Sequence, residues 1–214
     1  MAKNELTTEK MTQALDWAYE KALNGLPGDL SSESLAKSYM KKFSSTDEAI
    51  HSLIKWQTAK SSTSGFVTGL GGIVTLPVAV PVNIASVLYV QMRMIAAIAY
   101  MRGYDLKDDQ VQTFVFICLT GQAASDILKQ SGITVGTKLT VQLIKKVPGA
   151  TLTKINQKVA FRLVTKFGEK GVINLGKLVP VVGGVIGASV DGVGTKIIGN
   201  QANKLFVELD SSVI

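Results

Sequence analysis

The chain has 214 residues, of which 46% are apolar and 18% are charged, and its mean hydropathy is +0.26. This length suits one domain with a sizeable core, and the apolar content excludes a disordered chain. Residues 1–60 hold eight basic and eight acidic residues, whereas residues 129–204 hold twelve basic and two acidic residues, a net charge of +10. Such an excess of positive charge in one part of the chain predicts an anionic partner.

Helical signals dominate the first sixty residues. Apolar residues recur at helical spacing over residues 8–24, and Gly25 is expected to end that helix. A second, shorter helix is expected over residues 31–43. Ser45 and Glu48 have the spacing of a capping box, which predicts the start of a third helix.

Residues 65–90 contain no charge and are long enough for one helix to cross a bilayer. Glycines four positions apart would open a small-residue face, and the two prolines would kink or stop a helix. The segment is therefore expected either to pack backbone to backbone in the core or to enter lipid. The candidate residues for membrane or helix contact here are Gly65, Gly69, Gly72, Pro77 and Pro81.

A helix is predicted from residue 83 to 101, and Arg93 is the one charged residue between Lys60 and Arg102. A further helix is expected to open at Asp105 and to run to about residue 130. An unpaired buried guanidinium is very costly, so Arg93 should meet a carboxylate. The expected partners are Asp126 and Asp191.

Four polar residues in apolar surroundings form a candidate polar centre, namely Arg93, Asp105, Asp126 and Asp191. Carboxylates in a dry site have raised pKa values unless they are paired, and they can act as an acid or a base. The alternative is a single buried ion pair with a structural role.

A short helix is expected over residues 137–147, and Pro148 then breaks the chain. Residues 151–168 predict an amphipathic helix with one apolar and one basic side. Cationic side chains recur every four residues, and we identify them as candidate contacts for anionic lipid: Lys154, Lys158, Arg162 and Lys166. The alternative is the ordinary surface helix of a bundle.

The last apolar stretch begins at residue 178. Small residues four positions apart again predict close helix contact, and they are Gly184, Ala188 and Gly192. Asp191 interrupts the run, so a simple membrane span would bury a carboxylate. We predict an all-α, single-domain helical bundle with apolar helices broken by glycine and proline. Its expected parts are N-terminal amphipathic helices (1–60), a helical core (61–206) and a frayed tail (207–214).

Several kinds of chemistry lack support. With only His51 and Cys118, the chain has too few nitrogen and sulfur ligands for a zinc site. The sequence GLGGIV at 69–74 fits neither nucleotide-binding glycine motif. We therefore expect no cofactor and no metal. The basic block has few aromatic residues and no nucleic-acid motif, so no nucleic-acid partner is expected. Residues 1–10 lack the apolar region of a secretory signal, which favours the cytoplasm.

Three separated blocks occur in an order that resembles the EcsC family of bacterial proteins. They are GFVTGLGGIVTLPVAVP at 65–81, RMIAAIAYMRGYD at 93–105 and VPVVGGVIG at 179–187. The resemblance covers about residues 50–205. It implies a mostly helical protein, cytoplasmic or membrane-associated, from a family named for a protein encoded beside an ABC transporter. It implies no established reaction. Family members often carry an acidic residue where this chain has Ala79.

We expect a non-catalytic helical protein at the cytoplasmic face of the membrane, either peripheral or partly inserted. Its expected partner is an anionic membrane surface or a membrane protein, and it is a possible homo-oligomer. One alternative is an enzyme that acts on a lipid or a small apolar substrate through Arg93 and an aspartate. A second alternative is an adaptor for an ABC transporter or a protease system.

Overall fold

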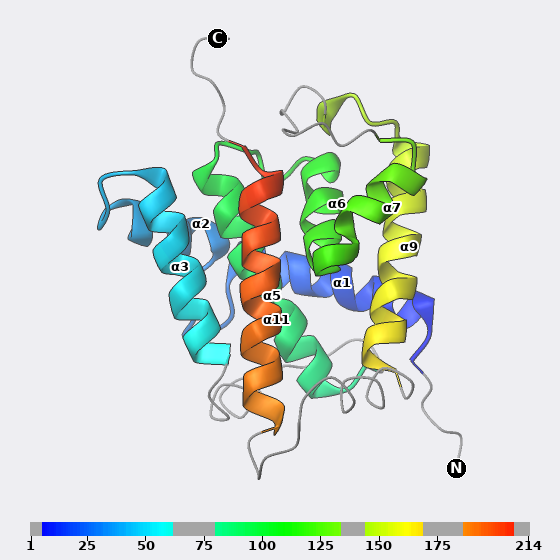
Figure 1. Ribbon diagram of the computed structural model, residues 1–214, viewed down its shortest axis with the longest axis horizontal. Helices are drawn as coiled ribbons and strands as arrows, with labels where there is room; N and C mark the ends of the chain where they lie inside the picture. The colour runs from blue at the N-terminus through cyan, green and yellow to red at the C-terminus, as the bar shows by residue number, and fades with distance from the viewer. Residues whose placement is uncertain (1–5, 62–79, 134–143, 169–185, 208–214) are drawn as a thin grey trace.

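The computed structural model describes residues 6–61, 80–133, 144–168 and 186–207 (Figure 1). The prediction of an all-α fold is confirmed, because the elements in these ranges are α-helices and one 3₁₀ turn. In chain order they are α1 (Thr8–Asn24), α2 (Ser32–Met40), α3 (Thr46–Ser61), α5 (Val82–Met101), α6 (Asp109–Cys118), η1 (Gly121–Ala123), α7 (Ala124–Gln130), α9 (Gly149–Phe167) and α11 (Ile186–Leu205).

A capping residue with a hydroxyl side chain lies at the start of each of the first three helices. The hydroxyl oxygen of Thr7 accepts a hydrogen bond from the Lys10 amide at 3.3 Å, and that of Ser45 accepts one from the Glu48 amide at 3.2 Å. These bonds satisfy amide groups that the first turn of a helix leaves without partners. Gly25 ends α1 with a φ of 80°, which is accessible to glycine at little cost.

Helix α5 is the centre of the bundle. It packs against α1, α2, α3, α6 and α11, and α1 crosses from α5 to α9 (Figure 1). The window Ile84–Met101 is long and apolar enough to cross a membrane, with a mean hydropathy of 1.5, but 89% of it is buried inside the protein. Such burial is typical of a core helix in a folded bundle.

The prediction of one helix from Asp105 to residue 130 is wrong. Asp105 lies in a turn, where its Oδ1 accepts the Lys107 amide at 2.9 Å, and α6 begins only at Asp109. Helix α6 ends at Cys118, and Gly121, the first residue of η1, has a φ of 59°. A side chain there would approach Ile197 Cγ2 of α11 at 3.3 Å, so this break also lets α11 pack closely.

The glycine and proline predictions fall partly outside the described residues. Gly65, Gly69, Gly72, Pro77 and Gly184 lie there, as do most of residues 137–147. Pro81 immediately precedes α5, as expected for a residue that stops one helix and permits the next to begin. Ala188 and Gly192 belong to α11, and Gly192 is buried.

Gly199, a glycine of α11 that the sequence did not single out, makes a tight helix contact. A Cβ atom on Gly199 would lie 2.9 Å from Ile54 Cγ1 of α3 and 3.2 Å from Met94 Cε of α5. The missing side chain therefore lets α11 approach two neighbouring helices at one point.

Candidate anion-binding site

Arg93 is buried in the bundle, with 2% of its surface exposed. It forms an ion pair with Asp29 and donates a hydrogen bond to the backbone oxygen of Leu30 at 3.1 Å. Its guanidinium lies 5.5 Å from the ring centroid of Tyr89, whose hydroxyl donates to Asp29 Oδ2 at 3.1 Å. The prediction that Arg93 meets a carboxylate is confirmed, and the partner is Asp29.

The other members of the predicted polar centre do not join this pair. Asp105 and Asp126 are both exposed, so Asp126 was the wrong partner for Arg93. The backbone of Asp191 belongs to α11, and its side chain lies outside the described part of the structure. Arg93 and Asp29 form an ion pair in which the guanidinium is buried and the carboxylate is 28% exposed.

A tight loop between α1 and α2 brings Asp29 to α5. Gly25 and Gly28 both have positive φ, and the Asp29 amide donates to the Leu26 oxygen at 2.8 Å. A Cβ on Gly25 would lie 2.8 Å from the backbone oxygen of Asp29, so glycine is needed for this loop to close. Pro27, Gly28 and Asp29 are turn-forming residues, but their sequence does not reveal which helix the turn contacts.

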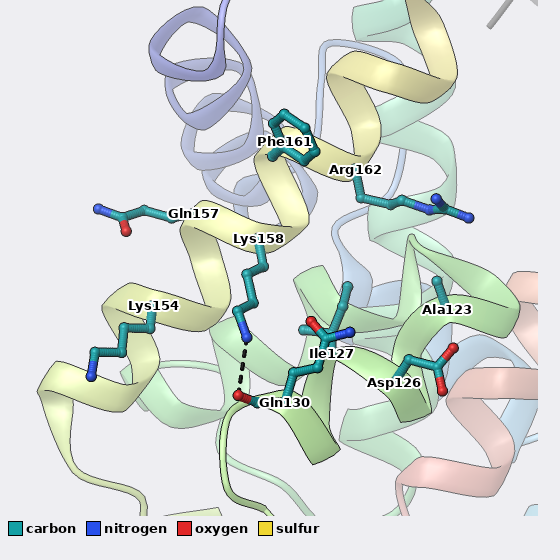
Figure 2. Close-up of a pocket in the computed structure, with 9 residues that line it drawn as sticks. All are labelled: Ala123, Asp126, Ile127, Gln130, Lys154, Gln157, Lys158, Phe161 and Arg162. Atoms are coloured by element: carbon teal, nitrogen blue, oxygen red, sulfur yellow. Dashed lines mark hydrogen bonds between the residues drawn. The ribbon is translucent and has the colours of Figure 1, made fainter.

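A surface pocket of about 560 Å³ lies between α7 and α9 (Figure 2). The lining residues on each side have the spacing that places side chains on the same face. The α9 stripe consists of Lys154, Gln157, Lys158, Phe161 and Arg162, and the facing side consists of Ala123 of η1 and of Asp126, Ile127 and Gln130 of α7.

The pocket combines three cations with one carboxylate. Lys158 Nζ donates to the backbone oxygen of Gln130 at 3.1 Å, at the end of α7. Within the described residues, Lys154, Arg162 and Asp126 form no ion pair within 4.0 Å. Their charges are therefore available to a ligand, and the excess of cations favours an anion.

Three of the four predicted lipid contacts meet at this pocket. Lys166 does not line it, and its Nζ lies 5.2 Å from the ring centroid of Phe167. Sequence reasoning missed Phe161, which is 66% exposed, and Gln157. Gln157 lies three residues after Lys154 and Phe161 three residues after Lys158, so the same helical periodicity could have found them.

The apolar face of α9 is covered by protein. Its buried residues pack in the bundle, where α9 contacts α1, α6 and α7, and they are Leu152, Ile155, Val159, Ala160 and Leu163. A helix that lies in a membrane interface would instead bury this face in lipid. Only the basic, outward face of α9 remains for a partner.

The described residues include no group of three or more His, Cys, Asp or Glu side chains that could hold a metal ion. Cys118 is fully buried, and burial raises the pKa of its thiol far above the ordinary value. His51 is exposed on α3.

No curated protein and no solved structure matches this chain. The sequence profile of the EcsC protein family matches residues 2–207. This match extends well beyond residues 50–205, on which the three sequence blocks had placed the resemblance, and it includes the N-terminal helices. The chain therefore belongs to the EcsC protein family.

Proposed function

We propose that this protein binds anionic lipid peripherally at the cytoplasmic face of the membrane. The contact surface is the basic face of α9, which we define as Lys154, Lys158, Phe161 and Arg162. The observation that carries the proposal is the convergence of three cations and an exposed aromatic ring on one stripe of a helix that has no acidic residue.

The strength of such a contact is moderate. Each Lys or Arg near an anionic surface contributes about 1 kcal/mol. Full burial of a Phe side chain contributes roughly 1.5–3 kcal/mol, and Phe161 is exposed enough to gain much of it. Because charge interactions are screened over about 8 Å at physiological salt, binding should weaken as salt rises.

A peripheral mode is favoured over insertion by the packing of the described helices. The apolar side of α9 is buried against protein, and the apolar window of α5 is 89% buried. Insertion of either helix would require the bundle to open and to lose those contacts. Attachment by the basic face requires no such rearrangement.

Co-sedimentation with vesicles tests the proposal. We expect binding to vesicles that contain about 30% phosphatidylglycerol, which gives them a substantial negative surface charge. We expect weak binding to vesicles of phosphatidylcholine alone, and release from the anionic vesicles by high salt. Lys154→Gln with Arg162→Gln should reduce binding by more than about tenfold, as expected for two such charges. The matched control is Lys41→Gln with Lys55→Gln, which removes the same charge from two exposed positions, directly after α2 and on α3.

A second pair of variants tests the aromatic contact. Phe161→Ala should weaken vesicle binding, whereas Trp56→Ala, which removes a side chain that is 59% exposed on α3, should not. Equal binding to neutral and anionic vesicles would contradict the proposal. So would equal losses in the α9 double variant and in its control.

A further inference from the structure

The pocket between α7 and α9 contains a carboxylate that a simple basic surface would not need. Asp126 projects from α7 on the side of the pocket where Arg162 projects from α9 (Figure 2). Across the described residues it forms no ion pair within 4.0 Å. The site therefore presents hydrogen-bond donors and one strong acceptor to the same ligand.

We propose that this pocket binds the headgroup of a phospholipid whose phosphodiester carries free hydroxyl groups. This inference rests on the proposed function and specifies the lipid. The phosphate contacts Arg162, a headgroup hydroxyl on the same side of the pocket donates a hydrogen bond to Asp126, and Lys158 donates to a second headgroup oxygen. Guanidinium and ammonium groups are the usual protein ligands of phosphate oxygens, and hydrogen bonds to a charged group are stronger than neutral ones.

Hydrogen-bonding groups and size both match this ligand. Free headgroup hydroxyls offer donors to Asp126, whereas the ionised oxygens of a phosphomonoester are acceptors and offer none. The volume of about 560 Å³ lies within the range of small-molecule sites, and the side chains of Ala123, Ile127 and Phe161 supply an apolar lining for the glycerol carbons.

The position of Lys158 strengthens the assignment. Its Nζ is held by the Gln130 oxygen at 3.1 Å, at the C-terminal end of α7, where a helix favours positive charge. This exposed hydrogen bond places the ammonium group on the α7 side of the pocket. The group retains donors for a headgroup oxygen, because an ammonium group has three.

The experiment compares the full-length protein on vesicles of phosphatidylglycerol and of phosphatidic acid at matched surface potential. We expect a preference of about tenfold for phosphatidylglycerol, the size of one charge-assisted hydrogen bond. Asp126→Asn should bring the ratio close to one, because the charged acceptor for the headgroup hydroxyl is lost. The control, Asp109→Asn, removes an exposed carboxylate in the first turn of α6 and should leave the ratio unchanged.

Soluble competitors distinguish a headgroup from free phosphate. Glycerophosphoglycerol should displace the protein from phosphatidylglycerol vesicles, whereas inorganic phosphate at equal ionic strength should not. Equal binding of both lipids by the unaltered protein, or equal displacement by the two competitors, would overturn the headgroup assignment while leaving the proposed function in place. A protein that binds neither anionic vesicle would overturn both.

Discussion

Arg93 and Asp29 form an ion pair that joins the middle of α5 to the loop between α1 and α2. The arginine side chain is 2% exposed and the aspartate side chain 28% exposed, so the pair lies at the inner edge of a solvent-accessible loop. The Tyr89 hydroxyl and the Leu30 oxygen complete the arrangement. One side chain of the central helix thus fixes the conformation of a connecting loop.

Loss of either partner of this pair should destabilise the fold. Asp29→Asn leaves the buried guanidinium without its partner and should lower the free energy of unfolding by about 3–5 kcal/mol. Arg93→Met should lower it by less, because Asp29 is 28% exposed. The double variant should lose less than the sum, because neither charge is then left unpaired. Urea unfolding of the four proteins measures the coupling, with Arg162→Met as an exposed control. Strictly additive losses would show that the pair is not coupled.

Substitution by alanine at two glycines of α11 should change the stability of the protein in opposite directions. Gly199→Ala should destabilise the protein by about 1–3 kcal/mol, because its Cβ would meet Ile54, a β-branched side chain with few alternative rotamers. Gly194→Ala should stabilise it by about 0.5–1 kcal/mol, because no described atom lies within 4 Å of the new Cβ and alanine favours a helix. Thermal unfolding checks both signs, and equal shifts would contradict this account of the α3–α11 contact.

Stability at alkaline pH should depend on Tyr89. Burial raises the pKa of Tyr89 to about 12, and the nearby Asp29 adds to this, although Arg93 opposes it. The pKa in the unfolded chain is about 10, so the unfolded state loses its proton first. The contribution of Tyr89 to the free energy of unfolding is complete below about pH 10 and is lost as the pH rises towards 12.

Tyr89→Phe tests this titration. The loss of unfolding free energy between about pH 9 and pH 11, where the unfolded phenol ionises, should be smaller in the variant than in the unaltered protein. Burial also raises the pKa of Tyr104, so the variant should keep part of the slope. Identical slopes in the two proteins would contradict the prediction.

Cys118 should report global opening of the bundle. The thiol is buried in α6 and burial raises its pKa, whereas the thiolate is the reactive form. We expect the native protein to react with a thiol-specific disulfide reagent only at the rate of opening. Reaction should become rapid in denaturing urea. Rapid stoichiometric labelling of the native protein would show that α6 is accessible.

Local sequence determined several helices closely. Helix α1 has the bounds expected from its apolar spacing and from Gly25, because caps and periodicity act within a few residues. The two faces of α9 were likewise predictable, since residues three and four positions apart share a face. The sequence thus determined that α9 has a buried side and a basic side.

The tertiary structure decided how these faces are used. Asp29 and Arg93 stand 64 positions apart, and no local pattern indicates that the α1–α2 loop closes over α5. The helix predicted from Asp105 to residue 130 is interrupted at Gly121, where α11 packs, and this places Asp126 opposite α9. Helical periodicity specifies which residues are buried, but the choice of partner depends on long-range packing of similar apolar surfaces, which becomes defined only when the whole core assembles.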